Sequence, residues 1–72
     1  MIFHQRLRDI REDNDKTQAQ IAEIIGTIQQ QYSRWERGIR QMPIENYKIL
    51  AEFYNISIDY LAGLIDTPHR LH

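Results

Sequence analysis

Residues 17–38, Thr-Gln-Ala-Gln-Ile-Ala-Glu-Ile-Ile-Gly-Thr-Ile-Gln-Gln-Gln-Tyr-Ser-Arg-Trp-Glu-Arg-Gly, decide the fold of this chain. Thr17 and Gln20 have the spacing of a capping box, in which each side chain accepts a hydrogen bond from the other residue's backbone N–H at a helix start. Gly26 can take the left-handed backbone conformation that ends a helix. The stretch therefore predicts a short helix beginning at Gln18, a tight turn and a second helix.

The second helix of this stretch is predicted to have one apolar side and one polar side. Thr27 and Gln30 repeat the capping spacing, and the helix is expected to end near Gly38. We expect four side chains to face inward at helical spacing: Ile28, Tyr32, Trp35 and Ile39. At about 100° per residue, the polar side covers roughly 140° and carries Gln29, Gln30, Ser33, Arg34 and Arg37.

Those polar side chains suit contact with DNA. Glutamine amides can pair with adenine, and arginine guanidiniums can pair with guanine, through two hydrogen bonds in the major groove. A solvated face of an ordinary amphipathic helix would have a similar composition. The face alone leaves both interpretations open.

The combined pattern resembles the helix-turn-helix of Cro and phage-repressor (XRE-like) transcriptional regulators. The likeness is carried by residues 18–22, 26–27, 29–30, 33–38 and 56–61, and it covers about residues 5–64. It implies an all-α, compact five-helix bundle of the lambda-repressor-like DNA-binding type with a central helix-turn-helix. The domain is expected to span residues 1–66, with a C-terminal tail at residues 67–72.

The resemblance also implies a function and residues that perform it. We expect sequence-specific binding to double-stranded DNA as a homodimer, with a recognition helix at about residues 28–37 in the major groove of a pseudo-palindromic operator. Bases would be read by Gln29, Gln30 and Arg34. The DNA backbone, which carries no direct sequence information, would be held by Gln18, Thr27, Ser33, Arg37, Arg40 and Gln41.

Arg11 and Glu36 match a structural ion pair of phage repressors, so the resemblance favours that pairing over a simple solvated charge at Arg11. Ile28 departs from the family pattern, which often places a serine or threonine cap there. If Ile28 is buried, Thr27 must cap the helix instead, and the helix begins one residue early. The loop at residues 39–43 also has fewer basic residues than in many relatives, which predicts a shallower salt dependence.

Composition sets further bounds. A chain of 72 residues allows one domain, and its lack of cysteine excludes disulfides and thiolate zinc sites. The net charge of −1 argues mildly against nucleic acid. However, residues 9–23 carry five acidic and two basic side chains (−3), whereas residues 27–48 carry four basic and two acidic ones (+2). The charge distribution is therefore polarised, and its positive end lies on the proposed recognition helix.

The remaining helices are predicted at residues 3–14, from Met42-Pro43 onward, and from Ile58 to about Leu64 after a Ser57 cap. In the first, Arg6 is expected outward, together with Arg8, Asp9 and Glu12. Five apolar side chains, not needed for the expected core, form a candidate dimer interface: Ile49, Phe53, Leu61, Leu64 and Ile65. An apolar surface without a partner is the alternative.

Other functional classes fit less well. No catalytic constellation is present, and so short a chain leaves little room for a substrate cleft, so we expect neither an enzyme nor a cofactor. His69 and His72 are three residues apart, but Pro68 and the chain end predict a loose tail and no metal site. No apolar run approaches the roughly 20 residues of a membrane span, which makes a cytoplasmic location the default expectation.

A second hypothesis keeps the fold but assigns it mainly to protein contacts. The acidic first half and the apolar stripe at Ile49 and Phe53 motivate it. In that case the chain would be an antitoxin or another interaction module, with a toxin or similar protein as its partner.

Overall fold

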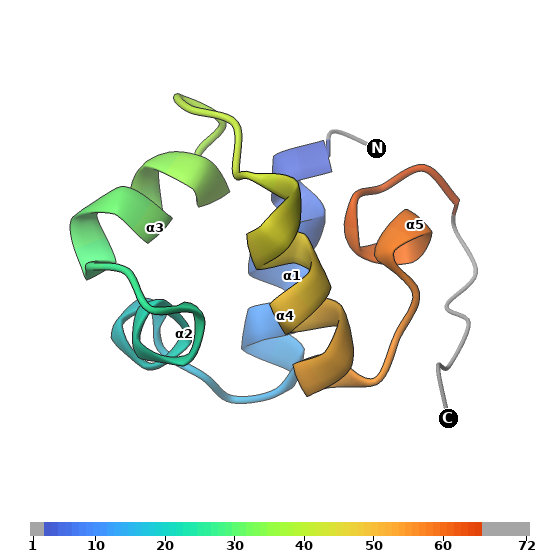
Figure 1. The fold of residues 1–72 in the computed structure, drawn as a ribbon, viewed down its shortest axis with the longest axis horizontal. Helices are drawn as coiled ribbons and strands as arrows, with labels where there is room; N and C mark the ends of the chain where they lie inside the picture. The colour runs from blue at the N-terminus through green and yellow to red at the C-terminus, as the bar shows by residue number, and fades with distance from the viewer. Residues whose placement is uncertain (1–2, 66–72) are drawn as a thin grey trace.

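The computed structural model describes residues 3–65, and the side chains from residue 5 onward. It contains α1 (Phe3–Asp13), α2 (Gln18–Ile25), α3 (Gln29–Glu36), α4 (Ile44–Tyr54) and α5 (Ile58–Leu61), and no strand within residues 3–65. Helices α1 and α4 occupy the middle, with α2 and α3 on one side and α5 on the other (Figure 1). The expected all-α five-helix fold is confirmed. The predicted tail at residues 67–72 lies outside the described residues.

The turn between α2 and α3 forms as its sequence predicts. Thr17 Oγ1 accepts from the Gln20 backbone N–H at 3.1 Å, and Gln20 Oε1 accepts from the Thr17 backbone N–H at 2.8 Å. Gly26 ends α2 with φ +77°, and the next N–H, that of Thr27, donates to the Ala22 carbonyl at 2.9 Å. These contacts hold the ends of α2 and fix the direction in which α3 leaves it.

Gly26→Ala is expected to lower the free energy of unfolding by about 1 to 2 kcal/mol, because an L-residue is strained at positive φ. A Cβ at this position meets no atom within 4 Å, so steric collision adds nothing. Gly26→Asn is the matched control and should cost less, since asparagine tolerates this conformation. Urea unfolding of the three proteins measures the difference, and equal stability of wild type and Gly26→Ala would contradict the argument.

The core is built from one side of every helix. Its buried apolar side chains are Leu7, Ile10, Ile21, Ala22, Ile25, Tyr32, Trp35, Met42, Leu50, Ala51 and Leu61. The prediction that Ile28 and Ile39 face inward is wrong, because they are 64% and 60% exposed. Both lie outside the eight-residue α3, Ile28 in extended backbone and Ile39 after the left-handed Gly38. Helical spacing therefore does not apply to them.

Arg6 is also placed differently from the prediction. It is buried, at 4% exposure, and does not point outward from α1. Its guanidinium lies 4.0 Å from the ring centroid of Tyr60 and donates to the carbonyls of Tyr60 at 3.3 Å and Ile65 at 3.4 Å. Hydrogen bonds and a cation–π contact offset the cost of burying the charge. Arg6 thus joins α1 to α5 and the segment after it.

The ends of α4 and α5 follow local backbone chemistry. Pro43 is the residue before α4 and not its first helical residue, and Asn55 ends the helix at φ 58°. Ser57 caps α5 by accepting from the Tyr60 N–H at 3.2 Å. The helix ends at Leu61, earlier than predicted, because Gly63 adopts φ +81° and turns the chain. Within the described residues, no helix is both long and apolar enough to cross a membrane.

Candidate nucleic-acid interface

A shallow groove of about 320 Å³ runs along the exposed side of α3. Its lining contains all three predicted base-reading residues and three of the six predicted backbone contacts: Gln18, Gln29, Gln30, Ser33, Arg34 and Arg37. The opposite side of α3 is held in place by Tyr32 and Trp35, which are 0% and 6% exposed. Packing of these two aromatic rings therefore directs the amides and guanidiniums outward together.

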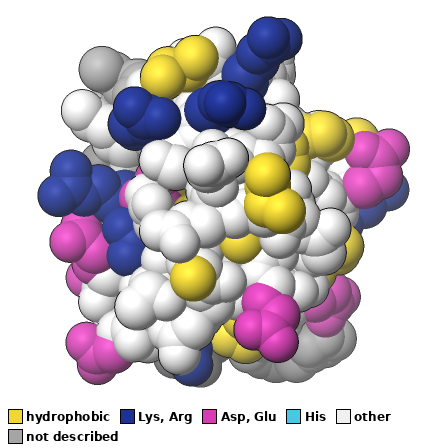
Figure 2. Space-filling model, turned by 90° about the vertical axis from the view of Figure 1, so that its left-hand side faces the viewer, with side chains coloured by type: hydrophobic (Ala, Val, Ile, Leu, Met, Phe, Trp, Pro, Cys, Tyr) yellow, Lys and Arg dark blue, Asp and Glu magenta, His cyan; other side chains and the backbone are white. Residues whose placement is uncertain are grey.

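The face that carries α2 and α3 has basic side chains along two of its edges. Figure 2 shows mostly white surface with scattered hydrophobic side chains in its middle, Lys and Arg along the top and left, and Asp and Glu at the left edge, the bottom and the right. Arg34 of α3 and Arg37, the residue that follows this helix, are exposed. Arg34 Nη1 lies 3.5 Å from Gln31 Oε1, and Arg37 Nε donates to the Ser33 carbonyl at 3.3 Å. Both contacts are solvent-exposed and weak enough to exchange for contacts with DNA.

A buried ion pair fixes α3 to α1. Arg11 donates to Glu36 through Nη2 at 2.8 Å and Nε at 2.9 Å, and through Nη1 to the Lys16 carbonyl at 2.8 Å. The side chains of Arg11 and Glu36 are 13% and 3% exposed. The ion pair expected from the family resemblance is therefore present, with the two-pronged geometry that makes such pairs strong.

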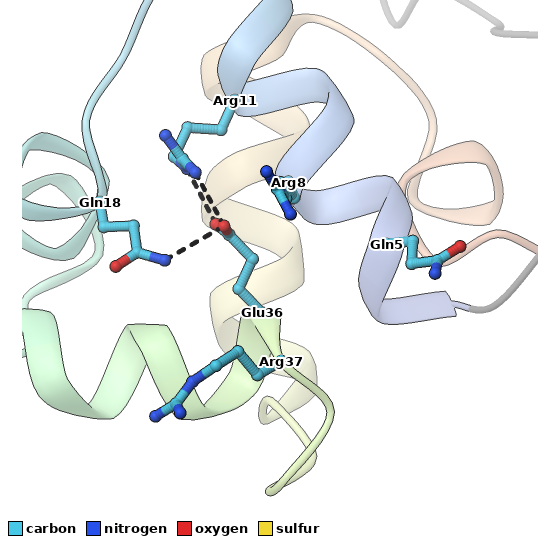
Figure 3. Close-up of a pocket in the computed structure, with 6 residues that line it drawn as sticks. All are labelled: Gln5, Arg8, Arg11, Gln18, Glu36 and Arg37. Atoms are coloured by element: carbon cyan, nitrogen blue, oxygen red, sulfur yellow. Dashed lines mark hydrogen bonds and ion pairs between the residues drawn. The ribbon is translucent and has the colours of Figure 1, made fainter.

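Gln18 joins the same network. Its Nε2 donates to Glu36 Oε1 at 3.2 Å, so Arg11 and Gln18 converge on one carboxylate from α1 and from the start of α2 (Figure 3). The side chain of Arg37 points away from that carboxylate in the same view. An amide nitrogen carries two N–H donors, so Gln18 keeps a second donor for another acceptor.

The network keeps Glu36 ionised. Burial disfavours its charged form, but the hydrogen bonds from Arg11 and Gln18 outweigh burial and hold the pKa of the Glu36 carboxyl below its usual value. The hydrogen bond to Glu36 in turn raises the pKa of Arg11. Burial raises the pKa of Tyr32 beside them, so this hydroxyl stays neutral.

Three predicted backbone contacts lie outside the α3 groove. Arg40 and Gln41 line a separate depression of about 380 Å³ in the loop after α3, beside the half-buried Tyr47. Thr27 is half-buried and does not cap α3. The capping residue is Ile28, whose side chain makes no cap hydrogen bond, so α3 does not begin early.

Two side chains of α1 lie beside the predicted DNA-binding residues, although the sequence prediction did not include them. Gln5 and Arg8 line a groove of about 440 Å³ together with Arg11, Gln18, Glu36 and Arg37 (Figure 3). Arg8 also pairs with Glu12 at 3.0 Å on the exposed side of the helix. The available signal was spacing, since Arg8 stands three residues before Arg11 and shares its side of the helix.

The candidate dimer surface is smaller than predicted. Ile49, Phe53 and Leu64 are exposed at 41%, 43% and 62%, and Ile65 is half-buried. The prediction that Leu61 lies on this surface is wrong, because its side chain is 0% exposed. It is the buried residue of α5 and packs in the core, where its burial stabilises a helix of only four residues.

Leu64 and the α4 stripe lie on different surfaces. Leu64 lines an apolar groove of about 420 Å³ with side chains that include Gln41, Met42, Ile44 and Ile58. Neither Ile49 nor Phe53 lines this groove; Phe53 instead has Lys16 5.9 Å from its ring centroid. The apolar side chains that were grouped together therefore form two separate patches. Among the described residues, no group of three His, Cys, Asp or Glu could hold a metal ion.

Helices α2 and α3, with the Gly26 turn between them and the polar side of α3 exposed, have the arrangement of a helix-turn-helix. Residues 7–61 match the helix-turn-helix family HTH_3. The chain belongs to this family. The match extends from α1 into the end of α5 and so includes the helices that support the motif.

Curated relatives of this helix-turn-helix chain are bacterial and phage regulators. It is 37% identical over 93% of its length to YobD of Bacillus subtilis, described as an uncharacterized HTH-type transcriptional regulator. It is 30% identical over 92% to the cryptic phage CTXphi transcriptional repressor RstR of Vibrio cholerae. It is 31% identical over 88% to the HTH-type transcriptional activator BcrR of Enterococcus faecalis.

The chain spans only part of these relatives. It covers 60% of the length of YobD, 60% of RstR and 31% of BcrR. The similarity therefore concerns the helix-turn-helix part of each protein. The search of solved structures found no match.

Proposed function

We propose that this chain binds double-stranded DNA in a sequence-specific manner and regulates transcription in the cytoplasm from the site it occupies. The observation that carries the proposal is the groove along α3, where three glutamines and two arginines stand side by side: Gln18, Gln29, Gln30, Arg34 and Arg37. Amides and guanidiniums together can match adenine and guanine edges. Relatives named as transcriptional repressors and activators support the regulatory role.

In this proposal α3 enters the major groove, with Gln29, Gln30 and Arg34 on base edges. Gln18, Ser33 and Arg37 hold phosphates on one flank, while Thr27, Arg40 and Gln41 extend the contacts along the backbone. The second donor of the Gln18 amide is available for a phosphate while the first remains on Glu36. Gln5 and Arg8 line the neighbouring groove together with Arg37, and the guanidinium of Arg8 adds positive charge to that flank.

The proposed DNA-binding form is a homodimer on a pseudo-palindromic operator, with half-sites about one helical turn, roughly 34 Å, apart. We assign the dimer contact to the groove that contains Leu64 and to the half-buried Ile65, which follows it in the chain. Gln41 lines this groove and also belongs to the loop after α3. A two-fold axis here would therefore bring two copies together next to their DNA-binding loops.

Leu64→Glu is expected to raise the dimer dissociation constant by about tenfold or more, because a large apolar side chain on each copy is no longer buried. Leu64 is 62% exposed in the monomer, so its fold should be retained. Phe53→Glu is the matched control on the other apolar patch and should leave the dimer unchanged. Sedimentation equilibrium measures both; the reverse pattern would move the interface to Ile49 and Phe53.

The dependence of binding on salt tests the DNA contact itself. Affinity for a duplex should fall with a log–log slope of about −0.9 for each phosphate neutralised, and Arg37→Ala should make that slope shallower by about one. Glu45→Gln, on the exposed surface of α4, is the control and should leave the slope unchanged. Fluorescence anisotropy with a labelled duplex provides the measurement.

A protein-interaction module, such as an antitoxin, is the second candidate function. The specific observation in its favour is the exposed patch of Ile49 and Phe53, which the proposed dimer leaves uncovered. Weak duplex binding without a salt slope would favour this function over DNA binding.

A further inference from the structure

The side chain of Ile28 neither caps α3 nor belongs to the buried core. Ile28 occupies the capping position of α3, yet its aliphatic side chain makes no cap hydrogen bond. Serine, threonine, aspartate and asparagine are favoured at this position because they can accept from the backbone N–H groups of the first turn. Ile28 is also 64% exposed and adds little to the core. A residue that violates both preferences at once is characteristic of a functional position.

The position of Ile28 is favourable for contact with bases. It directly precedes Gln29 and Gln30, which line the α3 groove. In helix-turn-helix proteins the N-terminal residues of the recognition helix are those that reach base edges. The Ile28 side chain is thus placed at the tip of the element that is proposed to enter the major groove.

We propose that Ile28 is a specificity-determining residue that contacts the 5-methyl group of a thymine in the major groove. The inference rests on the proposed function. It adds an apolar base contact to the polar ones proposed for Gln29, Gln30 and Arg34. The thymine methyl is the apolar feature that base pairs display in this groove, and aliphatic side chains recognise it by contact. Burying an exposed isoleucine against it removes apolar surface of both partners from water.

The glutamines next to Ile28 are also suited to recognising A·T base pairs. Glutamine pairs with the N6 and N7 positions of adenine, and each adenine is opposite a thymine. Gln29 and Ile28 can therefore read consecutive A·T pairs, one through hydrogen bonds and the other through a methyl contact. The expected half-site has a thymine at the position facing the start of α3.

The experiment uses the operator obtained by selection from random duplex DNA and replaces each thymine of one half-site, in turn, by deoxyuridine. This change removes only the methyl group. Wild-type protein should bind one substituted operator about fourfold more weakly, as expected for one buried carbon. Ile28→Ser removes the apolar contact while supplying a hydroxyl that can cap α3, so thermal stability should be equal to or above wild type.

With Ile28→Ser, the thymine and deoxyuridine operators should be bound equally at that position, while the other thymines keep their wild-type effects. Ile24→Ala, a truncation on α2 at a side chain with 36% exposure, is the matched control and should retain the discrimination. Unchanged discrimination in a folded Ile28→Ser protein would overturn the inference and leave the proposed function standing. Failure to select any operator would overturn both.

Discussion

Glu36→Ala is expected to lower the free energy of unfolding by about 3 to 5 kcal/mol, the largest stability effect of any single substitution considered for this chain. The substitution leaves the Arg11 guanidinium, 13% exposed, without the carboxylate that accepts two of its hydrogen bonds. It also removes the link between α1, the start of α2 and the end of α3. Urea or thermal unfolding measures the loss.

The matched control is the exposed ion pair between Arg8 and Glu12, whose side chains are 65% and 52% exposed. Glu12→Ala should cost less than about 1 kcal/mol, because solvent screens such a pair. Similar losses for Glu36→Ala and Glu12→Ala would show that the buried pair contributes no more than a surface one.

The Arg11–Glu36 ion pair makes the free energy of unfolding depend on pH in the acid range. The pKa of Glu36 is lowered from the ordinary value of 4.5 in the folded state, so its contribution is fully present above that pH. The contribution is lost as pH falls through the lower, folded-state pKa. Glu36→Gln cannot lose this proton-linked stability, and its unfolding free energy should decline less steeply than that of wild type below pH 4.5.

Arg34→Ala is expected to cost about 1 to 3 kcal/mol in binding to the selected operator, which corresponds to roughly 5- to 150-fold in affinity. Arg34 is exposed on α3 and lines the groove with Gln29 and Gln30. If it pairs with guanine, its loss should also relax the preference at one base position, measured by competition among operators that differ at that position.

Gln18→Ala provides the contrasting result. Its proposed partner is a phosphate, so binding to the operator and to random DNA should weaken by the same factor. Because Gln18 also donates to Glu36, its folding stability must be measured in parallel. Equal losses on operator and random DNA for both Arg34→Ala and Gln18→Ala would contradict the division between base reading and backbone contact.

Much of the fold could be predicted because its decisive signals are local. The Thr17–Gln20 capping box, the left-handed Gly26 and the Ser57 cap each depend on residues within four positions along the chain. The polar side of α3 follows from helical periodicity in the same way. The pairing of Arg11 with Glu36 is not local, and only the family resemblance indicated it.

The differences arise where tertiary contacts or helix ends decide the outcome. Arg6 is buried because α5 and the segment after it supply carbonyls and an aromatic ring from more than 50 residues away in sequence. Leu61 enters the core because its side chain belongs to the buried cluster that joins α5 to the other helices. Ile28 and Ile39 do not face inward, because α3 begins after Ile28 and ends before Ile39. Periodicity alone predicts none of these outcomes.

The most direct test of the central claim is selection of binding sites from a random library of duplex DNA, sequenced at two salt concentrations. A sequence-specific homodimer should enrich an inverted repeat whose half-sites lie about one helical turn apart, and higher salt should reduce recovery of nonspecific DNA more than that of the repeat. Absence of any enriched sequence, even at low salt, would contradict the account and favour the protein-interaction function.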